Sequence, residues 1–367
     1  MSINASWNIV NFRAGLIAAL RGRGYRVAAL APRDEYSDRL AAMGVEFEPI
    51  EIDKQGLSPL RDLRLLLRYR RAMRRLRPDI YLGYTAKPNV YGSLAAHMLD
   101  IKVINNVAGL GTAFIRGGIL ALVVKALYRI AFRRSATVFF QNEEDRSLFV
   151  GSGIVPAAIA QLLPGSGIDL TRFAPAPRPA GDGEFRFLLV ARLLWDKGVR
   201  EYVEAARLVR AEAPHARFQI LGFLDVENRT AVARADVERW VAEDAIDYLG
   251  QSDDVRPFLQ AADCVVLPSY REGLPRSLLE ASAMARPLIA TDVPGCRHVL
   301  EDGVNGFLCT VRDARSLADA MLKMLHLDPR QRLAMGAAAR LKVEREFDER
   351  LVAERYLTAI EQAIGRP

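Results

Sequence analysis

The pattern of apolar and polar residues changes repeatedly between two periods along the chain. Short apolar runs are typical of buried strands, and the longer segments between them carry apolar residues at the helical period. In the first half, strands are expected at residues 25–30, 80–84 and 137–141, and helices at 12–21, 60–76 and 119–134.

The second half repeats this alternation more regularly. Strands that alternate with helices pair in parallel, and the helices then cover both faces of the sheet. Because 367 residues exceed one ordinary domain, the sequence predicts an α/β protein with two Rossmann-like, doubly wound parallel-sheet domains. In this half, strands are expected at 185–190, 217–221, 264–268 and 287–290, and helices near 198–212, 228–243, 275–285 and 314–326.

A segment rich in proline and glycine, residues 163–182, separates the halves and is the predicted linker. We therefore expect one domain over residues 1–165 and a second over 166–345. Ligands of open α/β sheets bind beyond the carboxyl ends of the strands. Two such sheets facing each other would enclose an inter-domain cleft.

The start of the chain is irregular for this architecture. A first parallel strand should have about five residues, yet only three residues precede Asn4, and the polar segment 4–8 follows at once. We expect the natural start to lie upstream of Met1 and the first strand to be clipped in this sequence.

The two halves differ in charge. Residues 1–165 contain 23 Lys and Arg against 13 Asp and Glu, whereas residues 166–367 contain 28 against 31. The basic first half suggests that this part of the protein faces something anionic.

The cysteines and the apolar helices narrow the class of protein. Cys264, Cys296 and Cys309 lack CxxC spacing, so neither a disulfide framework nor a zinc site is predicted, and a reducing cytosol is compatible. The longest apolar helical segment is interrupted by Lys125 and Arg129, so it is not expected to span a membrane.

The segment from Glu272 to Glu280, EGLPRSLLE, follows a predicted strand and opens a predicted helix. Pro275 suits the first helical position because its missing N–H costs nothing there. The amides of Arg276 and Ser277 would then face a diphosphate at the positive helix end. Glu280, further into the helix, can accept hydrogen bonds from a ribose diol, and Glu272 would face the sugar. The alternative is a solvated helix start with two ordinary surface glutamates.

A second polar segment, residues 190–198, stands at the end of the first strand of the second half. Arg192 and Lys197 leave a strand end and a helix start together, so both cations can converge on one anion. Fixed cations stabilise a departing nucleoside diphosphate without a metal. The alternative is a pair of exposed basic residues at a helix start.

Together these segments resemble the retaining GT-B glycosyltransferases of family 4. The likeness follows one order through nearly the whole second half, in segments 191–198, 221–222, 249–250, 262–269, 272–287 and 302–308.

The resemblance implies roles for individual residues. Glu272 would contact the transferred sugar and Glu280 the ribose, while Arg192 and Lys197 would bind the diphosphate and segment 249–255 would lie against the base. Further donor-binding positions implied in this way are Gly273, Leu274, Arg276, Ser277, Gly250 and Gly109.

The same resemblance implies three general properties. A final helix at 347–363, within residues 346–367, would cross back onto the first domain. Transfer would proceed with retention, with the departing phosphate accepting the proton of the acceptor hydroxyl. No metal ion and no cofactor would be needed.

The first half is similar, more narrowly, to bacterial transferases that build capsule, O-antigen or glycan chains on lipid carriers. Segments 84–89 and 104–111 carry this likeness. Two positions depart from it, because segment 4–8 replaces a common glycine pair and Ala108 replaces a common histidine before Gly109. A histidine contact to the donor is therefore not expected, and backbone amides around Gly109 would serve instead.

Two helices of the first half are basic and amphipathic. Residues 60–77 interleave eight arginines with leucines, and residues 119–134 repeat the pattern. Such helices can lie in a membrane interface and attract anionic lipids. The alternative is a solvated basic face whose apolar side packs on the sheet, and core packing explains 119–134 equally well. The predicted membrane-binding residues are Arg61, Arg64, Arg68, Arg71 and Arg75.

These observations favour a hexosyltransferase. It would move a hexose or N-acetylhexosamine from a nucleotide sugar, with UDP favoured, to a lipid-linked saccharide at the cytoplasmic face of the membrane, in surface polysaccharide assembly. Nucleic acid is not an expected partner, because no zinc-finger, aromatic RNA-binding or helix-turn-helix motif accompanies the arginines. The alternatives are a nucleotide-sugar epimerase or hydrolase, and a non-catalytic membrane-docking subunit.

Overall fold

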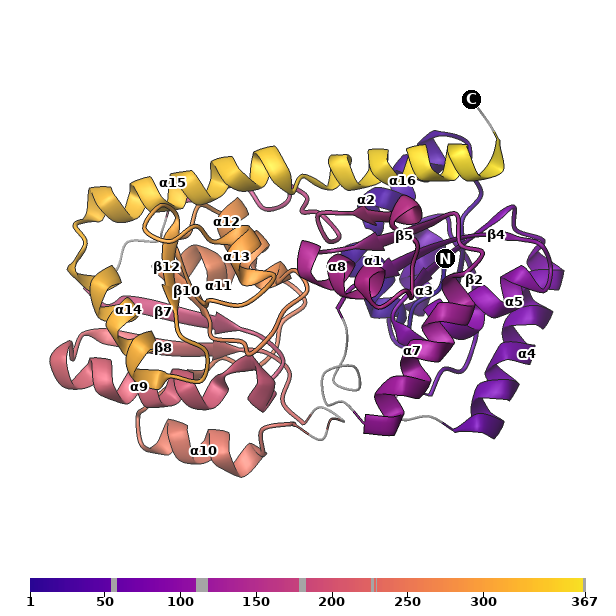
Figure 1. Cartoon of the computed structure of the whole chain (residues 1–367). Coiled ribbons are helices and arrows are strands. Elements are labelled where there is room, and N and C mark those ends of the chain that lie inside the picture. Colours follow the sequence, from indigo (N-terminus) through magenta and orange to yellow (C-terminus); the bar gives the residue numbers. More distant parts are fainter. Residues whose placement is uncertain (54–57, 110–117, 178–182, 226–227, 229, 366–367) are drawn as a thin grey trace. The chain divides into compact units, whose positions relative to one another are not determined.

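The computed structural model describes residues 1–53, 58–109, 118–177, 183–225, 228 and 230–365. The chain forms two compact units (Figure 1). Unit 1 comprises Met1–Gly167 and Glu349–Pro367, and unit 2 comprises Ile168–Asp348. These limits differ by two and three residues from the predicted limits at 165 and 345.

The sheet of unit 1 consists of two groups of parallel strands, β2-β1 and β3-β4-β5-β6. Residues 1–3 join the groups, because Ser2 forms parallel bridges with Leu30 of β1 and with Gly83 of β3. They occupy the place of a first strand, and the start of the natural chain stays a prediction. The strands are β1 (Ala28–Ala31), β2 (Glu46–Pro49), β3 (Ile80–Tyr84), β4 (Lys102–Val107), β5 (Thr137–Phe140) and β6 (Ala160–Leu162).

Helices cover both faces of this sheet. One buried cluster contains Tyr69 of α4, Tyr128 of α7 and Phe149 of α8, and the other contains Ile17 of α2 and Tyr356 of α16. The helices are α1 (Ser6–Phe12), α2 (Ala14–Gly22), α3 (Ser37–Ala42), α4 (Pro59–Leu76), η1 (Pro88–Gly92), α5 (Ser93–His97), α7 (Gly118–Phe132), α8 (Glu143–Gly151), η2 (Ala157–Ile159) and α16 (Glu349–Ile364).

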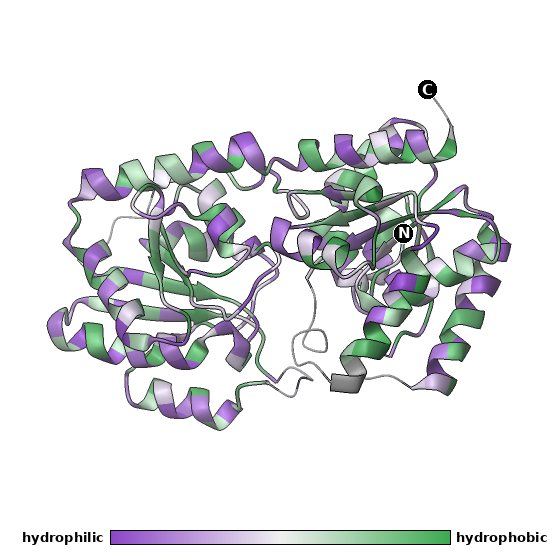
Figure 2. Ribbon diagram, in the orientation of Figure 1, coloured by the Kyte–Doolittle hydropathy of each residue, from purple (hydrophilic) through white to green (hydrophobic). Residues whose placement is uncertain are grey.

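Unit 2 has one parallel sheet in the order β12-β11-β10-β7-β8-β9. Its strands are largely hydrophobic, whereas the helices mix both kinds of residue (Figure 2). One face is covered by α9, α10 and α14, and the other by α11, α12, α13 and α15. The strands are β7 (Phe185–Val190), β8 (Ala216–Leu221), β9 (Asp247–Tyr248), β10 (Cys264–Leu267), β11 (Leu288–Thr291) and β12 (Gly306–Cys309). The helices are η3 (Trp195–Lys197), α9 (Val199–Glu212), α10 (Arg234–Ala242), α11 (Arg256–Ala261), α12 (Arg276–Ala283), α13 (Cys296–Val299), α14 (Ala314–His326) and α15 (Pro329–Glu346).

Several predicted elements need correction. The strand expected at 25–30 is β1, which begins only at Ala28. The helix expected at 12–21 is α2, which begins at Ala14 because Arg13 adopts φ −130° and ψ 6°. Helix α1, which ends just before Arg13, was not predicted. Strand β4 was not predicted, since Asn105 and Asn106 interrupt its apolar run, yet both side chains are buried.

The boundary between the units falls within the predicted linker, but the later part of this segment is packed. Ile168 and Phe173 lie in the buried core of unit 2, and the guanidinium of Arg340 donates to the carbonyl of Phe173 over 2.8 Å. The segment therefore packs as part of unit 2 from Ile168 onward. Residues 178–182 lie outside the described part.

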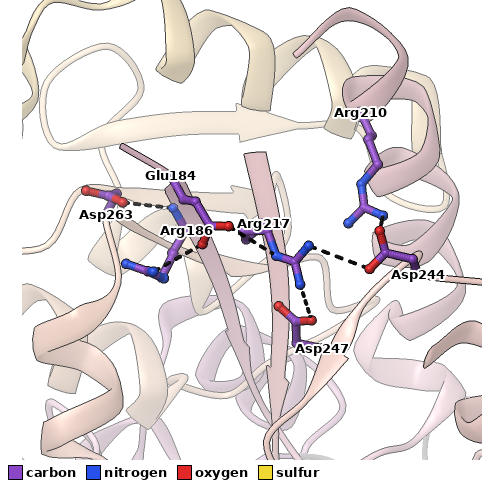
Figure 3. Close-up of polar contacts among 7 residues, drawn as sticks. All are labelled: Glu184, Arg186, Arg210, Arg217, Asp244, Asp247 and Asp263. Carbon is purple, nitrogen blue, oxygen red and sulfur yellow. Dashed lines mark hydrogen bonds and ion pairs between the residues drawn. The ribbon is translucent and has the colours of Figure 1, made fainter. Parts of the chain in front are cut away.

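A network of ion pairs lies at the amino edge of the unit 2 sheet (Figure 3). Arg217 of β8 contacts Asp247 over 2.7 Å, Asp244 over 3.6 Å and Glu184 over 3.9 Å. Arg186 of β7 joins the network through Glu184 at 3.1 Å. These charges neutralise one another at the start of the strands.

Candidate active site

The two polar segments singled out in the sequence follow adjacent strands of unit 2. The chain winds away from β7 in both directions, so the strand order reverses between β7 and β10, which pair in parallel. Loops at such a point leave an open crevice at the carboxyl edge of a sheet. The fold therefore brings residues 191–198 and 268–276 to one place.

The loop after β7 approaches the loop after β10 closely. Gly198, with φ +72°, stands between η3 and α9, and a Cβ atom there would lie 2.0 Å from the carbonyl oxygen of Pro268. Only glycine permits this approach without a shift of the backbone. The amide of Tyr270 also donates to the carbonyl of Asp196 over 2.9 Å. The backbones of the two loops are thus in direct contact and hold each other in place.

Glu272 and Lys197, one from each of these two loops, form an ion pair. The Nζ atom of Lys197 lies 2.5 Å from Oε1 of Glu272, and the two side chains are only 21% and 12% exposed. The hydroxyl of Ser269 donates to the same Oε1 atom over 2.7 Å. The carboxylate is therefore held in one orientation by two neighbours.

Arg192 behaves differently from Lys197. Its side chain is exposed, and this side chain takes part in none of the hydrogen bonds or ion pairs found among the described residues. The expectation that Arg192 and Lys197 converge on one anion stays a prediction, because in this structure Lys197 contacts Glu272.

Helix α12 begins one residue later than predicted. Arg276 is its first residue, and Pro275, with φ −75° and ψ 111°, precedes the helix as its N-cap. Its carbonyl accepts the first helical hydrogen bond, from the amide of Leu279, over 3.3 Å, as is usual for an N-cap residue. The first amides of any helix lack partners within the helix, so Ser277 and its neighbours still present amides at the carboxyl edge of the sheet.

Glu280 lies one turn into α12 and is largely buried. Its Oε1 accepts a hydrogen bond of 2.9 Å from Nε of Arg276. Burial raises the pKa of Glu280, and the negative charge of Asp254 raises it further. The positive charges of Arg276 and Arg172 lower it, but the net shift is upward. Asp254 belongs to segment 249–255, and the expected contact of this segment with the base stays a prediction.

The remaining predicted donor positions fall in two places. Gly273 and Leu274 belong to the loop between β10 and α12, and Gly250, with φ +78°, follows β9. Gly109, with φ +124°, follows β4 in unit 1. Gly111, the last residue of the first-half motif, lies outside the described residues. No contact in this structure tests these positions.

Two residues of the site were missed in the sequence. Ser269 directly holds Glu272, and the backbone of Gly295 lies so close that a Cβ atom would be 2.6 Å from the carbonyl oxygen of Gly273. Gly295 also has φ +83°. Gly295 follows β11, which lies next to β10 in the sheet, and this position could have pointed to it. The order of the strands, however, cannot be predicted from local periodicity.

The described side chains of the first-half motifs bond mainly to other residues of unit 1. The amide of Asn105 donates to Oδ1 of Asn89 over 3.0 Å and to Oγ of Ser93 over 2.8 Å. Lys87 forms a largely buried ion pair of 2.9 Å with Asp62 of α4. These side chains fix the end of β3 beside β4. Among the described residues, no group of three or more His, Cys, Asp or Glu side chains could hold a metal ion.

Two family models match the chain. The model described as glycosyl transferases group 1 matches residues 184–326, which contain the site in unit 2. The model described as glycosyl transferase 4-like domain matches residues 9–165. Between them they cover most of both units.

Two curated relatives are similar over long stretches. An N,N'-diacetylbacillosaminyl-diphospho-undecaprenol alpha-1,3-N-acetylgalactosaminyltransferase of Campylobacter jejuni is 29% identical over 98% of this chain and 97% of its own. A UDP-Gal:alpha-D-GlcNAc-diphosphoundecaprenol alpha-1,3-galactosyltransferase of Escherichia coli is 25% identical over 74% of this chain and 72% of its own.

The fold is shared with a solved structure. Anabaena HepE, crystallised with UDP and glucose, matches with a TM-score of 0.77 over 95% of each chain at 18% identity. The matched family models, the relatives and this fold agree, and the chain belongs to the GT-B glycosyltransferases of family 4.

Proposed function

We propose that this glycosyltransferase moves a hexose or N-acetylhexosamine from a UDP-sugar to a lipid-linked saccharide. It acts with retention, without a metal ion, at the cytoplasmic face of the membrane, as one step of surface polysaccharide assembly. The observation that carries the proposal is the Lys197–Glu272 pair, held beside the first turn of α12 at the carboxyl edge of the unit 2 sheet.

Each group has a chemical task in this proposal. The diphosphate lies against the first amides of α12, where the helix end is positive. Arg192, which has no side-chain partner among the described residues, supplies positive charge as the diphosphate departs. When the diphosphate draws Lys197 toward itself, Glu272 is left with Ser269 and becomes an acceptor for a hydroxyl of the transferred sugar. Glu280 accepts hydrogen bonds from the ribose.

The nucleotide, acceptor and stereochemistry rest on the relatives. The Escherichia coli relative is named for UDP-Gal, and both relatives are named for acceptors on undecaprenol diphosphate. UDP-galactose is an α-anomer, and the named linkage is also α, which is the outcome of retention. With no protein nucleophile assigned, the departing phosphate takes the proton of the acceptor hydroxyl.

Two other functions fit the same fold. An epimerase or hydrolase would convert the nucleotide sugar without an acceptor, and a membrane-docking subunit would bind no nucleotide. Product analysis by mass spectrometry, with and without an undecaprenyl-diphosphate saccharide, separates them from transfer. Nuclear magnetic resonance of the product gives the anomer, and a β-linked product contradicts retention.

The donor site is tested by calorimetric titration with UDP and GDP. We expect UDP to bind and Arg192→Ala to weaken binding by about tenfold or more, since a hydrogen bond to a charged group is worth ~1.5–3 kcal/mol. Arg217→Ala is the matched control, because Arg217 lies at the amino edge of the same sheet. Tighter binding of GDP contradicts the UDP assignment, and equal binding by Arg192→Ala contradicts the cation site.

A further inference from the structure

Helix α4 presents leucines on the side turned away from the sheet. Leu65, Tyr69 and Met73 face the core, as expected of an amphipathic helix. Leu60, Leu63 and Leu67 are nevertheless 72%, 53% and 51% exposed. Their spacing of three and four residues places them on one side of the helix, and we call these three residues the leucine ridge. A solvated helix normally carries polar residues on that side.

The arginines of α4 fall into two groups. Arg61, Arg68 and Arg75 lie on one flank and form ion pairs with Asp53, Glu51 and Glu48, respectively. Arg64, Arg71 and Arg74 stand three, four or seven residues from members of the leucine ridge, and so flank it on the exposed side. They take part in none of the ion pairs found among the described residues.

Acidic side chains are missing from this exposed face. The only acidic residue between 59 and 76 is Asp62, which is buried and bound to Lys87. The leucine ridge and its three unpaired arginines are thus both apolar and strongly positive. A surface with this combination complements anionic headgroups above an acyl layer.

Helix α7 repeats the arrangement. Leu122 and Ile130 are 66% and 59% exposed, and residues 118–134 contain no acidic residue. Both α4 and α7 pack against η1 and α5, so they lie on the same side of the unit 1 sheet (Figure 1). Two neighbouring helices therefore expose apolar residues and positive charge on one side of the unit.

We propose that the exposed faces of α4 and α7 dock unit 1 onto an anionic lipid bilayer. The leucine ridge and Leu122 enter the boundary between headgroups and acyl chains, and Arg64, Arg71 and Arg74 bind lipid phosphates. This inference rests on the proposed function in one respect: a lipid-linked acceptor lies at a membrane surface, which gives the protein a reason to bind there. It assigns lipid binding to a subset of the arginines, because the paired ones are already neutralised.

The test is co-sedimentation of the full chain with vesicles of phosphatidylglycerol and phosphatidylethanolamine in equal amounts. Leu60→Ser with Leu63→Ser should weaken binding by about tenfold or more, because each leucine forfeits apolar burial worth over a kcal/mol. The matched control is Leu333→Ser with Leu341→Ser on α15, which removes two leucines that are 74% and 65% exposed in unit 2. The control should bind as the wild type does.

The arginine groups are compared in the same assay. Arg64→Gln with Arg71→Gln should weaken binding by roughly tenfold or more, since each basic residue near an anionic surface contributes about 1 kcal/mol. Arg61→Gln with Arg68→Gln should have a clearly smaller effect. Vesicles of phosphatidylcholine alone should bind the wild type weakly, and added salt should weaken binding to the anionic vesicles.

Three results with the variants overturn the inference. They are equal vesicle binding by the ridge variant and the wild type, equal loss in the α15 control, and a dimer in light scattering that the ridge variant abolishes. Circular dichroism confirms that each variant is folded. Wild-type transfer to a short-chain, water-soluble acceptor is measured separately, so absence of vesicle binding with intact transfer refutes the docking surface and leaves the proposed function standing.

Discussion

The two edges of the unit 2 sheet carry similar kinds of charged residues in different arrangements. At the amino edge, Arg217 and Arg186 are satisfied by neighbouring carboxylates (Figure 3). At the carboxyl edge, Lys197 shares its carboxylate with a serine, and Arg192 is exposed and unpaired among the described residues. The charges at the amino edge neutralise one another, whereas we propose that those at the carboxyl edge exchange partners with the donor.

This contrast shows that the number of charges does not identify a site. Both edges hold arginines near acidic residues, but only the carboxyl edge adds the first amides of a helix and a reversal of strand order. Substitutions at the two edges should therefore affect different properties, catalysis at one and stability at the other.

The largest effect is expected from Glu272→Ala. Removing the carboxylate deletes the proposed sugar contact and leaves Lys197 without its partner. We expect kcat/KM to fall by about 10²-fold or more, as for loss of one preorganised electrostatic group, while the Tm changes by a few degrees at most. Steady-state transfer assays measure this. Activity within a few-fold of wild type would show that Glu272 does not touch the transferred sugar.

A smaller effect is expected from Ser269→Ala. Its hydroxyl orients Glu272 and contacts no other described side chain at the site, so we expect kcat to fall about tenfold, the value of one hydrogen bond. The affinity for UDP should change less than about twofold. Ser282→Ala is the control, because the Ser282 hydroxyl is buried and has no hydrogen-bond partner among the described residues. Equal kcat values for the two variants would contradict the prediction that Ser269 positions Glu272.

At the amino edge, Arg217→Ala should affect stability alone. Its side chain is 30% exposed and joins three carboxylates, so the free energy of unfolding should fall by about 1 kcal/mol, as for a partly exposed ion-pair network. Calorimetric unfolding measures this loss. A decrease in kcat at temperatures where the variant remains folded would contradict the division of roles between the edges.

The smallest effect is a pH dependence of nucleotide binding. Burial raises the pKa of Glu280 above the ordinary glutamate value of 4.5. As the pH falls through this raised pKa, the carboxylate gains a proton and loses an acceptor, so UDP affinity should fall several-fold. Calorimetry across acidic pH compares wild type with Glu280→Gln, which should lack this component. Identical pH profiles for the two proteins would show that Glu280 does not contact the nucleotide.

Much of the fold could be predicted from local periodicity. The bounds of β3, β7 and α14 were predicted to the residue, and those of β8 and β10 to within one residue. Errors occurred where polar residues are buried by tertiary contacts, as in β4, whose asparagines bond to Asn89, Ser93 and Tyr356. Periodicity cannot anticipate such partners, because they come from distant parts of the chain.

The sequence by itself determined the two α/β units and the positions of both polar segments at strand ends, since strand and helix periods and turn residues are local properties. Only the tertiary structure decided that Lys197 meets Glu272, 75 residues away, because strand order arises from long-range pairing. It also decided which arginines of α4 are paired and which flank exposed leucines. A helical pattern fixes the residues that share a face, but the packing of the sheet decides which face is covered.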